Sequence, residues 1–138
     1  GVDLNTPMPA VTAAGWINGP AVTPESFRGK VVVIDFFATW CGPCKAATPE
    51  LVETAKRFQD KEVLFMALTS EEAEDLPTLQ AFITKFQIPW VIGYGAEETQ
   101  ERFKTDYIPR VWVINKQGQV TWDSYSPGTL EDAITAAL

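Results

Sequence analysis

The chain has 138 residues, of which 46% are hydrophobic and 21% charged, and its formal net charge at pH 7 is −7. This size and composition predict a single domain, residues 1–138, with a buried core, and exclude a disordered or membrane-spanning chain. The negative charge argues against nucleic acid and anionic membrane surfaces as partners, because both would repel it. The chain begins at Gly1 without a charged and apolar leader, so we expect a processed or trimmed form.

The first thirty residues predict an addition at the edge of a sheet. Residues 1–10 read as an extended entry segment, and residues 11–17 as a strand. Asn18-Gly19 is a two-residue turn signal that leads into Ala21-Val22, so an N-terminal β-hairpin is expected. Residues 24–27 predict one helical turn.

A strand, a helix and a second strand follow. Residues 31–37 form an apolar, β-branched run that is typical of a strand covered on both faces. Apolar residues then recur at helical spacing from Cys41 to about Gln59, with a bend expected at Pro49. Residues 63–68 predict a strand parallel to the first one, with the helix as a right-handed crossover.

The rest of the chain alternates between helices and short strands. Residues 71–75 are rich in acids and predict a solvated loop. Further elements are expected as a helix up to Phe86, a strand over 90–92, a helix over 97–104, a hairpin of strands 110–114 and 120–125, and a last helix opened by a cap at 129–132. These elements together predict an α/β sandwich around a mixed sheet.

The only two cysteines lie in Trp40-Cys41-Gly42-Pro43-Cys44, where the first strand turns into the helix. At a helix N-terminus, unpaired amides and the positive end of the dipole favour a thiolate, and the pKa of such CxxC thiols falls to about 7 or below from about 8.5. A mixed disulfide at Cys41 is readily broken by a second thiol that is held one helical turn away at high effective concentration. We expect Cys41 to attack and Cys44 to resolve.

Other uses of the two thiols are less well supported by the sequence. Structural zinc needs two further ligands, and the chain has no other cysteine and no histidine. A purely structural disulfide would close a very short loop and restrict the unfolded chain little. Thiolates suit Cu(I), so a copper-handling or substrate-holding module without redox turnover stays an alternative, although only Met8 and Met66 are present.

Asp35 is the one charged side chain inside the first apolar strand, six positions before Cys41. Burial would raise the pKa of its carboxyl and suit it to taking and returning the proton of Cys44 during exchange. The alternative is an aspartate at a strand end that bonds backbone amides.

Asp35, the WCGPCK segment from Trp40 to Lys45, and Pro49 resemble the active-site segment of thioredoxin. The resemblance implies a thioredoxin-like fold. Ile108-Pro109, followed by the strand 110–114, is similar to the cis-proline loop of that family, which implies that Ile108 and Pro109 position an extended substrate. It also implies that Trp40, Gly42 and Pro43 shape the substrate site.

The long segment between Cys44 and Pro109, with its central strand and helix insertion, resembles the TlpA/ResA branch of the thioredoxin superfamily. The resemblance implies a thiol-disulfide oxidoreductase of the bacterial periplasm or outer face of the cytoplasmic membrane, with cytoplasmic residence as the alternative. It also implies a disulfide-bearing protein substrate, an upstream thiol reductant protein, and a role in cytochrome c maturation. The Gly-Pro pair resembles reducing thioredoxins, so we expect a reductase, without metal or cofactor, and a monomer. A peroxidase would need the proline-led peroxiredoxin pattern, which is absent before Cys41.

The sequence departs from the family at three places. ResA-like proteins commonly carry a glutamate where this chain has Ala47, so the acid role falls to Asp35. Thioredoxins carry a lysine in the strand that here is 63–68, and this strand has none. The usual threonine after the cis-proline is Arg110, which we expect to bring a positive charge beside the sulfurs and to influence substrate choice.

Overall fold

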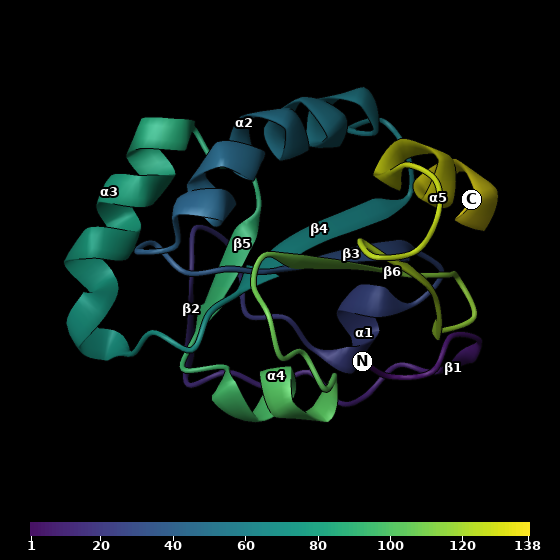
Figure 1. The fold of residues 1–138 in the computed structure, drawn as a ribbon, viewed down its shortest axis with the longest axis horizontal. Coiled ribbons are helices and arrows are strands. Elements are labelled where there is room, and N and C mark those ends of the chain that lie inside the picture. The colour runs from purple at the N-terminus through teal and green to yellow at the C-terminus, as the bar shows by residue number, and fades with distance from the viewer.

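The computed structural model describes residues 1–138, which form a seven-stranded mixed sheet covered by helices on both faces (Figure 1). The strands are β1 (Thr6–Pro7), β2 (Gly15–Ile17), β3 (Val31–Phe36), β4 (Val63–Leu68), β5 (Val91–Tyr94), β6 (Arg110–Ile114) and β7 (Gln119–Asp123). The helices are α1 (Pro24–Phe27), α2 (Gly42–Arg57), α3 (Leu76–Phe86), α4 (Glu97–Arg102) and α5 (Leu130–Ala137), with a 3-10 turn at Ala73–Asp75.

The centre of the sheet is β3, as its apolar sequence predicts. All six of its residues are buried, and it pairs in parallel with β4 and antiparallel with β6. The order across the sheet is β1-β7-β6-β3-β4-β5-β2. β4 follows β3 through the crossover helix α2, and the strand, helix and strand arrangement confirms the expected βαβ unit.

Two layers of helices bury the two faces of the sheet. Helices α2, α3 and α5 lie on one face and α1 and α4 on the other (Figure 1). On the first face, β3 contributes Val31 and Val33, and on the second it contributes Ile34 and Phe36. Because successive side chains of a strand point to opposite faces, this alternation places Asp35 on the face covered by α2.

The prediction of an N-terminal β-hairpin is wrong. β1 pairs with β7 and β2 pairs with β5, so the two short strands lie at opposite edges of the sheet. Asn18 does adopt a left-handed conformation, with φ 65°, but it does not reverse the chain into a paired strand. Its side-chain amide instead donates to the carbonyls of Ile88 and Trp90, both at 2.8 Å, and so ties the end of β2 to the start of β5.

Helix α2 carries the cysteines at its N-terminus and contains Pro49, as expected. Its ribbon bends along its length (Figure 1), and Pro49 within the helix removes one backbone donor. The buried side chains of its second half, Leu51, Val52 and Ala55, pack against the sheet. No helix of the chain combines the length and apolar character needed to cross a membrane.

Candidate active site

Cys41 and Cys44 form a disulfide at the N-terminus of α2, with their Cα atoms 5.2 Å apart. Cys41 is the N-cap residue, and its Sγ accepts a hydrogen bond from the backbone N–H of Cys44 at 3.1 Å. A sulfur in this position meets the amide donor and the helix dipole that stabilise a thiolate, as the sequence predicts. Gly42 and Pro43 are the first two helical residues, and proline suits this position because no intrahelical donor is lost.

Both cysteines are buried in the same hydrophobic cluster, and the tryptophan next to them in the sequence is exposed. Cys41 exposes 5% of its surface and Cys44 2%, so both are largely covered by apolar neighbours. The residue just before them, Trp40, is 72% exposed. The cysteine segment therefore reaches the surface through Trp40, and the attacking role of Cys41 and the resolving role of Cys44 stay predictions.

Cys44 and Asp35 line the same cavity of about 410 Å³, which also reaches Pro109. Asp35 is 8% exposed and forms no hydrogen bond or ion pair with another side chain. Burial raises the pKa of its carboxyl from 3.8 to about 7. The structure thus brings together the resolving cysteine, a carboxyl that changes protonation near neutral pH, and the proline loop.

The Ile108–Pro109 peptide bond is cis, as the resemblance implied. Ile108 packs against the hydrophobic clusters on both faces of the sheet, at the point where the chain enters β6. Pro109 lines the cavity beside Cys44. The proline loop and the start of α2 are therefore neighbours, although 65 residues separate them in the sequence.

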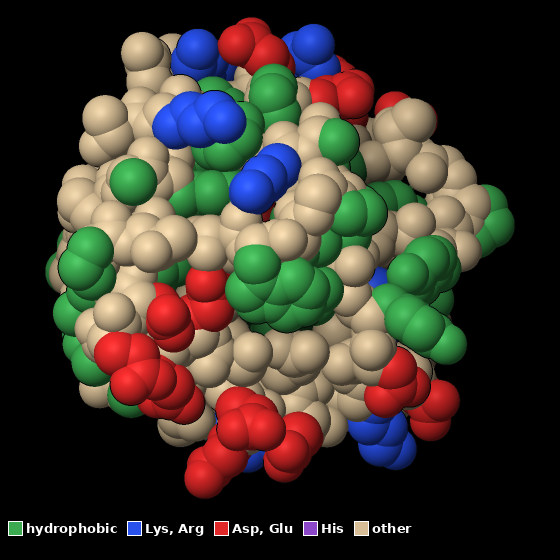
Figure 2. Space-filling view, turned by 60° about the vertical axis from the view of Figure 1, so that its left-hand side comes forward, with side chains coloured by type: hydrophobic (Ala, Val, Ile, Leu, Met, Phe, Trp, Pro, Cys, Tyr) green, Lys and Arg blue, Asp and Glu red, His purple; other side chains and the backbone are tan.

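The end of the molecule that carries α3 and the start of α2 lies at the left of Figure 1 and is turned forward in Figure 2. Hydrophobic side chains gather in the middle of this face, and acidic side chains follow its lower margin. Among the large hydrophobic residues exposed in the structure are Trp40, which precedes Cys41, and Tyr107, which precedes the proline loop. Both side chains thus expose aromatic area at positions next in sequence to Cys41 and Ile108.

Sequence reasoning missed Glu71, which it assigned to a solvated acidic loop. Glu71 is 9% exposed, and its carboxylate accepts hydrogen bonds from the Thr39 N–H at 2.9 Å and the Thr39 hydroxyl at 2.5 Å. The Thr69 hydroxyl donates to the same carboxylate at 2.8 Å. This carboxylate clamps the turn two residues before Cys41 to the end of β4. The signal available in the sequence was its place three residues after a buried parallel strand, at the edge of the sheet where active-site loops gather.

Arg110 does not fulfil the expectation that it places a positive charge beside the sulfurs. Its guanidinium pairs with Asp123 at 3.2 Å and lies 4.8 Å from the centre of the Trp112 ring. It also lies 4.4 Å from the ring of Tyr125. Trp112 belongs to the cluster on the α1 and α4 face, whereas the cysteines belong to the cluster on the α2 and α3 face. Arg110 is therefore a buried, paired cation on the other face of the sheet.

The other departures from thioredoxin have clear structural counterparts. Ala47 lines the cavity beside Cys44, where ResA-like proteins commonly carry a glutamate. The strand β4 brings no lysine to Asp35, and desolvation is the cause of its raised pKa. The chain positions no group of three or more His, Cys, Asp or Glu side chains that could hold a metal ion.

Comparisons with known proteins agree with this fold. The model of the Redoxin family matches residues 4–138. A thioredoxin of Echinococcus granulosus is 36% identical over 86 residues, covering 56% of this chain and 78% of its own length. The thiol-disulfide oxidoreductase ResA of Bacillus thuringiensis is 26% identical over 106 residues, covering 75% of this chain and 60% of its own length. This chain therefore spans less than two thirds of the ResA relative.

A solved structure is similar over nearly the whole chain. The solution structure of a thioredoxin-like protein in the oxidized form superimposes with a TM-score of 0.83 at 26% identity, covering 99% of this chain and 97% of that one. Fold and dithiol together define a protein-disulfide oxidoreductase of the thioredoxin superfamily. Within that class, the chain belongs to the Redoxin family and is similar to its ResA-like members.

Proposed function

We propose that this protein reduces disulfides in extracytoplasmic protein substrates. The observation that carries the proposal is the shared cavity of Cys44, Asp35 and Pro109 behind a dithiol whose first cysteine caps a helix. Similarity to ResA supports the location and the substrate class. An apocytochrome c whose cysteines must be reduced before haem attachment is one such substrate, which fits the resemblance to the TlpA/ResA branch.

The reaction begins with the reduced enzyme. The Cys41 thiolate attacks one sulfur of the substrate disulfide, the S–S bond breaks, and the other substrate sulfur leaves as a thiolate that takes up a proton. The Cys44 thiol then gives its proton to the Asp35 carboxylate and attacks Cys41 in the mixed disulfide. The second substrate thiolate leaves and is protonated, so the substrate gains two electrons and the enzyme ends as the Cys41–Cys44 disulfide.

Each neighbouring residue has a proposed part in this sequence. The N–H of Cys44 and the helix dipole stabilise the Cys41 thiolate for its attack on the substrate disulfide. Ile108 and Pro109 present backbone groups to an extended substrate, while Trp40, Gly42 and Pro43 shape the surface around the sulfur. A dithiol protein of lower potential returns the enzyme to its reduced form.

Catalysed reduction of insulin in the presence of dithiothreitol tests the proposal. The wild type should accelerate insulin precipitation, and the Cys41→Ser variant should run at the uncatalysed rate. A copper-handling or substrate-holding module gives a different result: wild type and Cys41→Ser would reduce insulin equally slowly, and the wild type would bind Cu(I) tightly. That outcome would replace the reductase assignment.

A further inference from the structure

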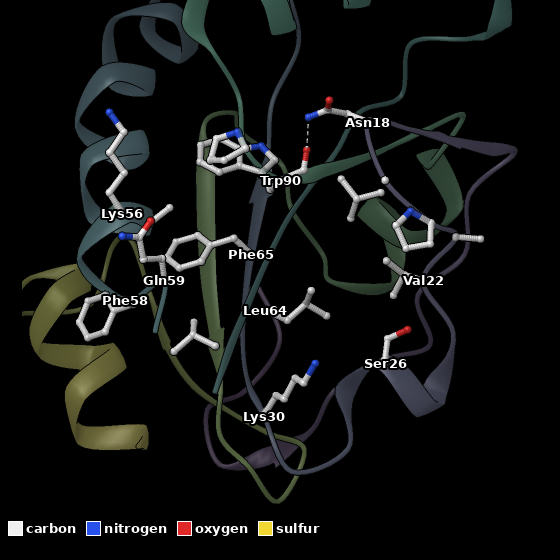
Figure 3. Close-up of a pocket in the computed structure, with 17 residues that line it drawn as sticks. Asn18, Val22, Ser26, Lys30, Lys56, Phe58, Gln59, Leu64, Phe65 and Trp90 are labelled. Atoms are coloured by element: carbon white, nitrogen blue, oxygen red, sulfur yellow. Dashed lines mark hydrogen bonds between the residues drawn. The ribbon is translucent and has the colours of Figure 1, made fainter. Parts of the chain in front are cut away.

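A notch opens at the edge of β4, at the other end of α2 from the disulfide (Figure 3). It has a volume of about 490 Å³ and lies between the C-terminal turn of α2, the first half of β4, and the segments 18–22 and 89–91. Cys41 and Lys56 lie at the two ends of α2, which at 1.5 Å per residue places the notch roughly 20 Å from the sulfurs. It is separate from the active site.

The notch exists because β5 covers only half of β4. β3 pairs with the whole of β4, from Val63 to Leu68, whereas pairing with β5 starts only at Met66 and Val91. The first three residues of β4 are accordingly half-buried, and the last three are fully buried. A central strand of the sheet thus behaves as an edge strand over Val63–Phe65.

Pro89 explains why β5 stops. If the register of Met66 with Val91 continued backwards by two residues, Pro89 would come opposite Leu64, but the pairing ends at Val91. Proline has no N–H to give to β4, so the ladder ends before it. The side chain of Asn18 holds the carbonyls of Ile88 and Trp90 and fixes this wall of the notch in place.

The backbone of β4 directs a donor and an acceptor into the notch. Phe37 N–H donates to the Leu68 carbonyl on the β3 side, and Thr69 N–H donates to Gly93 on the β5 side. Because these directions alternate along a parallel strand, Val63 and Phe65 face away from β3. The Val63 N–H is taken by the Lys61 carbonyl at 2.8 Å, so the Val63 carbonyl and the Phe65 N–H face the notch.

The side chains around this edge are apolar and cationic. Leu64 and Val22 lie on one side of the strand, and Phe65 and Trp90 stack on the other, with ring centres 6.2 Å apart (Figure 3). The lining includes two lysines, Lys30 and Lys56, and no aspartate or glutamate. In a chain of net charge −7 this is a local reversal of sign. Lys56 makes one exposed ion pair with Glu53 at 3.3 Å, which competes little with another partner.

We propose that this notch binds an extended polypeptide segment of a partner protein that carries acidic side chains. A residue of that segment opposite Leu64 donates to the Val63 carbonyl and accepts from the Phe65 N–H, as an added strand does. Its apolar side chains pack on Leu64 or Phe65, and its carboxylates face Lys30 and Lys56. This docking site would hold a partner while the dithiol at the far end of α2 remains free to react.

Two capped pentapeptides serve as probes: Val-Glu-Val-Glu-Val, and the same sequence with lysine in place of glutamate. Amide NMR of the wild type should show that the glutamate peptide slows exchange of the Phe65 N–H, and that the lysine peptide does not. In the double variant K30E/K56E the dissociation constant of the glutamate peptide should rise at least tenfold, because two attractive charges become repulsive. The variant Lys85→Glu, an exposed reversal on α3, should bind as the wild type does.

The proposal is overturned if millimolar glutamate peptide leaves the Phe65 amide unprotected, if both peptides bind equally, or if K30E/K56E retains wild-type affinity. Insulin reduction should be the same in the wild type and in both lysine variants, because none of these lysines contacts the dithiol. The docking site and the reductase assignment therefore succeed or fail separately.

Discussion

Asp35 and Cys44 line one cavity, although they come from the C-terminal end of β3 and the first turn of α2. The strand buries the carboxyl with no cationic partner, and the helix turns the second thiol inward toward the same space. The proposed proton transfer from Cys44 to Asp35 rests on this shared cavity, and the Cys41 sulfur is the one proposed to attack the substrate.

Replacing either cysteine separates the two steps of exchange. Cys44→Ser should form a mixed disulfide with a protein substrate and fail to release it, because Cys41 still attacks and no second thiol resolves the intermediate. Cys41→Ser should form no such adduct. Non-reducing gel electrophoresis after mixing reduced enzyme with an oxidised substrate distinguishes them, and a stable adduct in the Cys41→Ser variant would reverse the assigned roles.

The rate of resolution should depend on the ionisation of Asp35. The pKa of its carboxyl is about 7, so the wild-type rate of mixed-disulfide resolution should rise through this pH as the carboxylate becomes available as a base. Asp35→Asn should slow resolution about 100-fold at pH 8, as expected for loss of a general base, and should lose the inflection. Single-turnover kinetics across pH 5 to 9 provide the measurement, and an unchanged inflection in Asp35→Asn would assign it to another group.

The same carboxyl makes stability depend on pH. In the unfolded chain Asp35 ionises near 3.8, whereas in the folded protein it does so near 7, so the folded state holds the proton more tightly. The contribution of this carboxyl to the unfolding free energy is largest below about pH 4, falls as the pH rises to about 7, and is lost above that pH. The difference between the pKa in the unfolded and in the folded state corresponds to about 4 kcal/mol of unfolding free energy, at 1.36 kcal/mol per pKa unit.

Urea unfolding of wild type and Asp35→Asn across pH 4 to 8 isolates this effect. The difference in unfolding free energy between the two proteins should move in favour of the variant by up to about 4 kcal/mol over that range. Comparing the slopes with pH removes any constant packing effect of the substitution. A difference that stays constant with pH would mean that Asp35 is not buried as described.

Glu71 should matter for the geometry of the active-site turn. In Glu71→Gln one oxygen of the clamp becomes an amide that cannot accept from Thr39 or Thr69, so about 2 kcal/mol of stability should be lost. The pH dependence of Cys41 alkylation should shift as well, because the turn before it loosens. Glu72→Gln is the matched control, since Glu72 is exposed. If the two variants have the same stability in denaturation and the same pH dependence of Cys41 alkylation, the Glu71 carboxylate does not hold the active-site turn in place.

Replacing Arg110 should lower the stability of the protein and leave the rate of disulfide exchange unchanged. Arg110→Ala leaves Asp123 buried without its partner and removes the guanidinium from between two aromatic rings, which should cost about 3 to 5 kcal/mol. Arg57→Ala breaks the exposed pair with Glu131 and should cost less than about 1 kcal/mol. If Arg110→Ala instead preserves stability and alters the relative rates for cationic and anionic disulfide peptides, Arg110 contacts substrate.

Local patterns were sufficient to predict the centre of the molecule. The β-branched run of β3 and the CxxC segment have clear local signatures, whereas the cis-proline loop was predicted from the resemblance to thioredoxin; tertiary structure reinforces all three. The N-terminal strands could not be predicted in the same way, because a strand of two or three residues is specified by the edge that accepts it. Asn18-Gly19 favours a turn, yet the amide of Asn18 finds better partners in Ile88 and Trp90.

Charge patterns in the sequence led to wrong predictions for two residues that are buried in the folded protein. Glu71 begins a run of acids that is solvated from Glu72 to Glu74, and only the contacts of Thr39 and Thr69 distinguish it from them. Arg110 follows the proline loop in sequence, but alternation along β6 turns its side chain to the face away from the sulfurs. The burial of Glu71 depends on a contact with a residue more than ten positions away, and the place of Arg110 depends on which face of the sheet its side chain occupies. Neither can be predicted from the neighbouring residues in the sequence.

The reduction potential of the Cys41–Cys44 couple, measured by equilibration with glutathione or dithiothreitol buffers, tests the central claim most directly. A disulfide reductase should have a potential near that of thioredoxin, about −270 mV, so that electrons flow from the dithiol to the substrate. A potential near about −120 mV, as in the strong oxidant DsbA, would show that the protein donates disulfides and would contradict the reductase assignment.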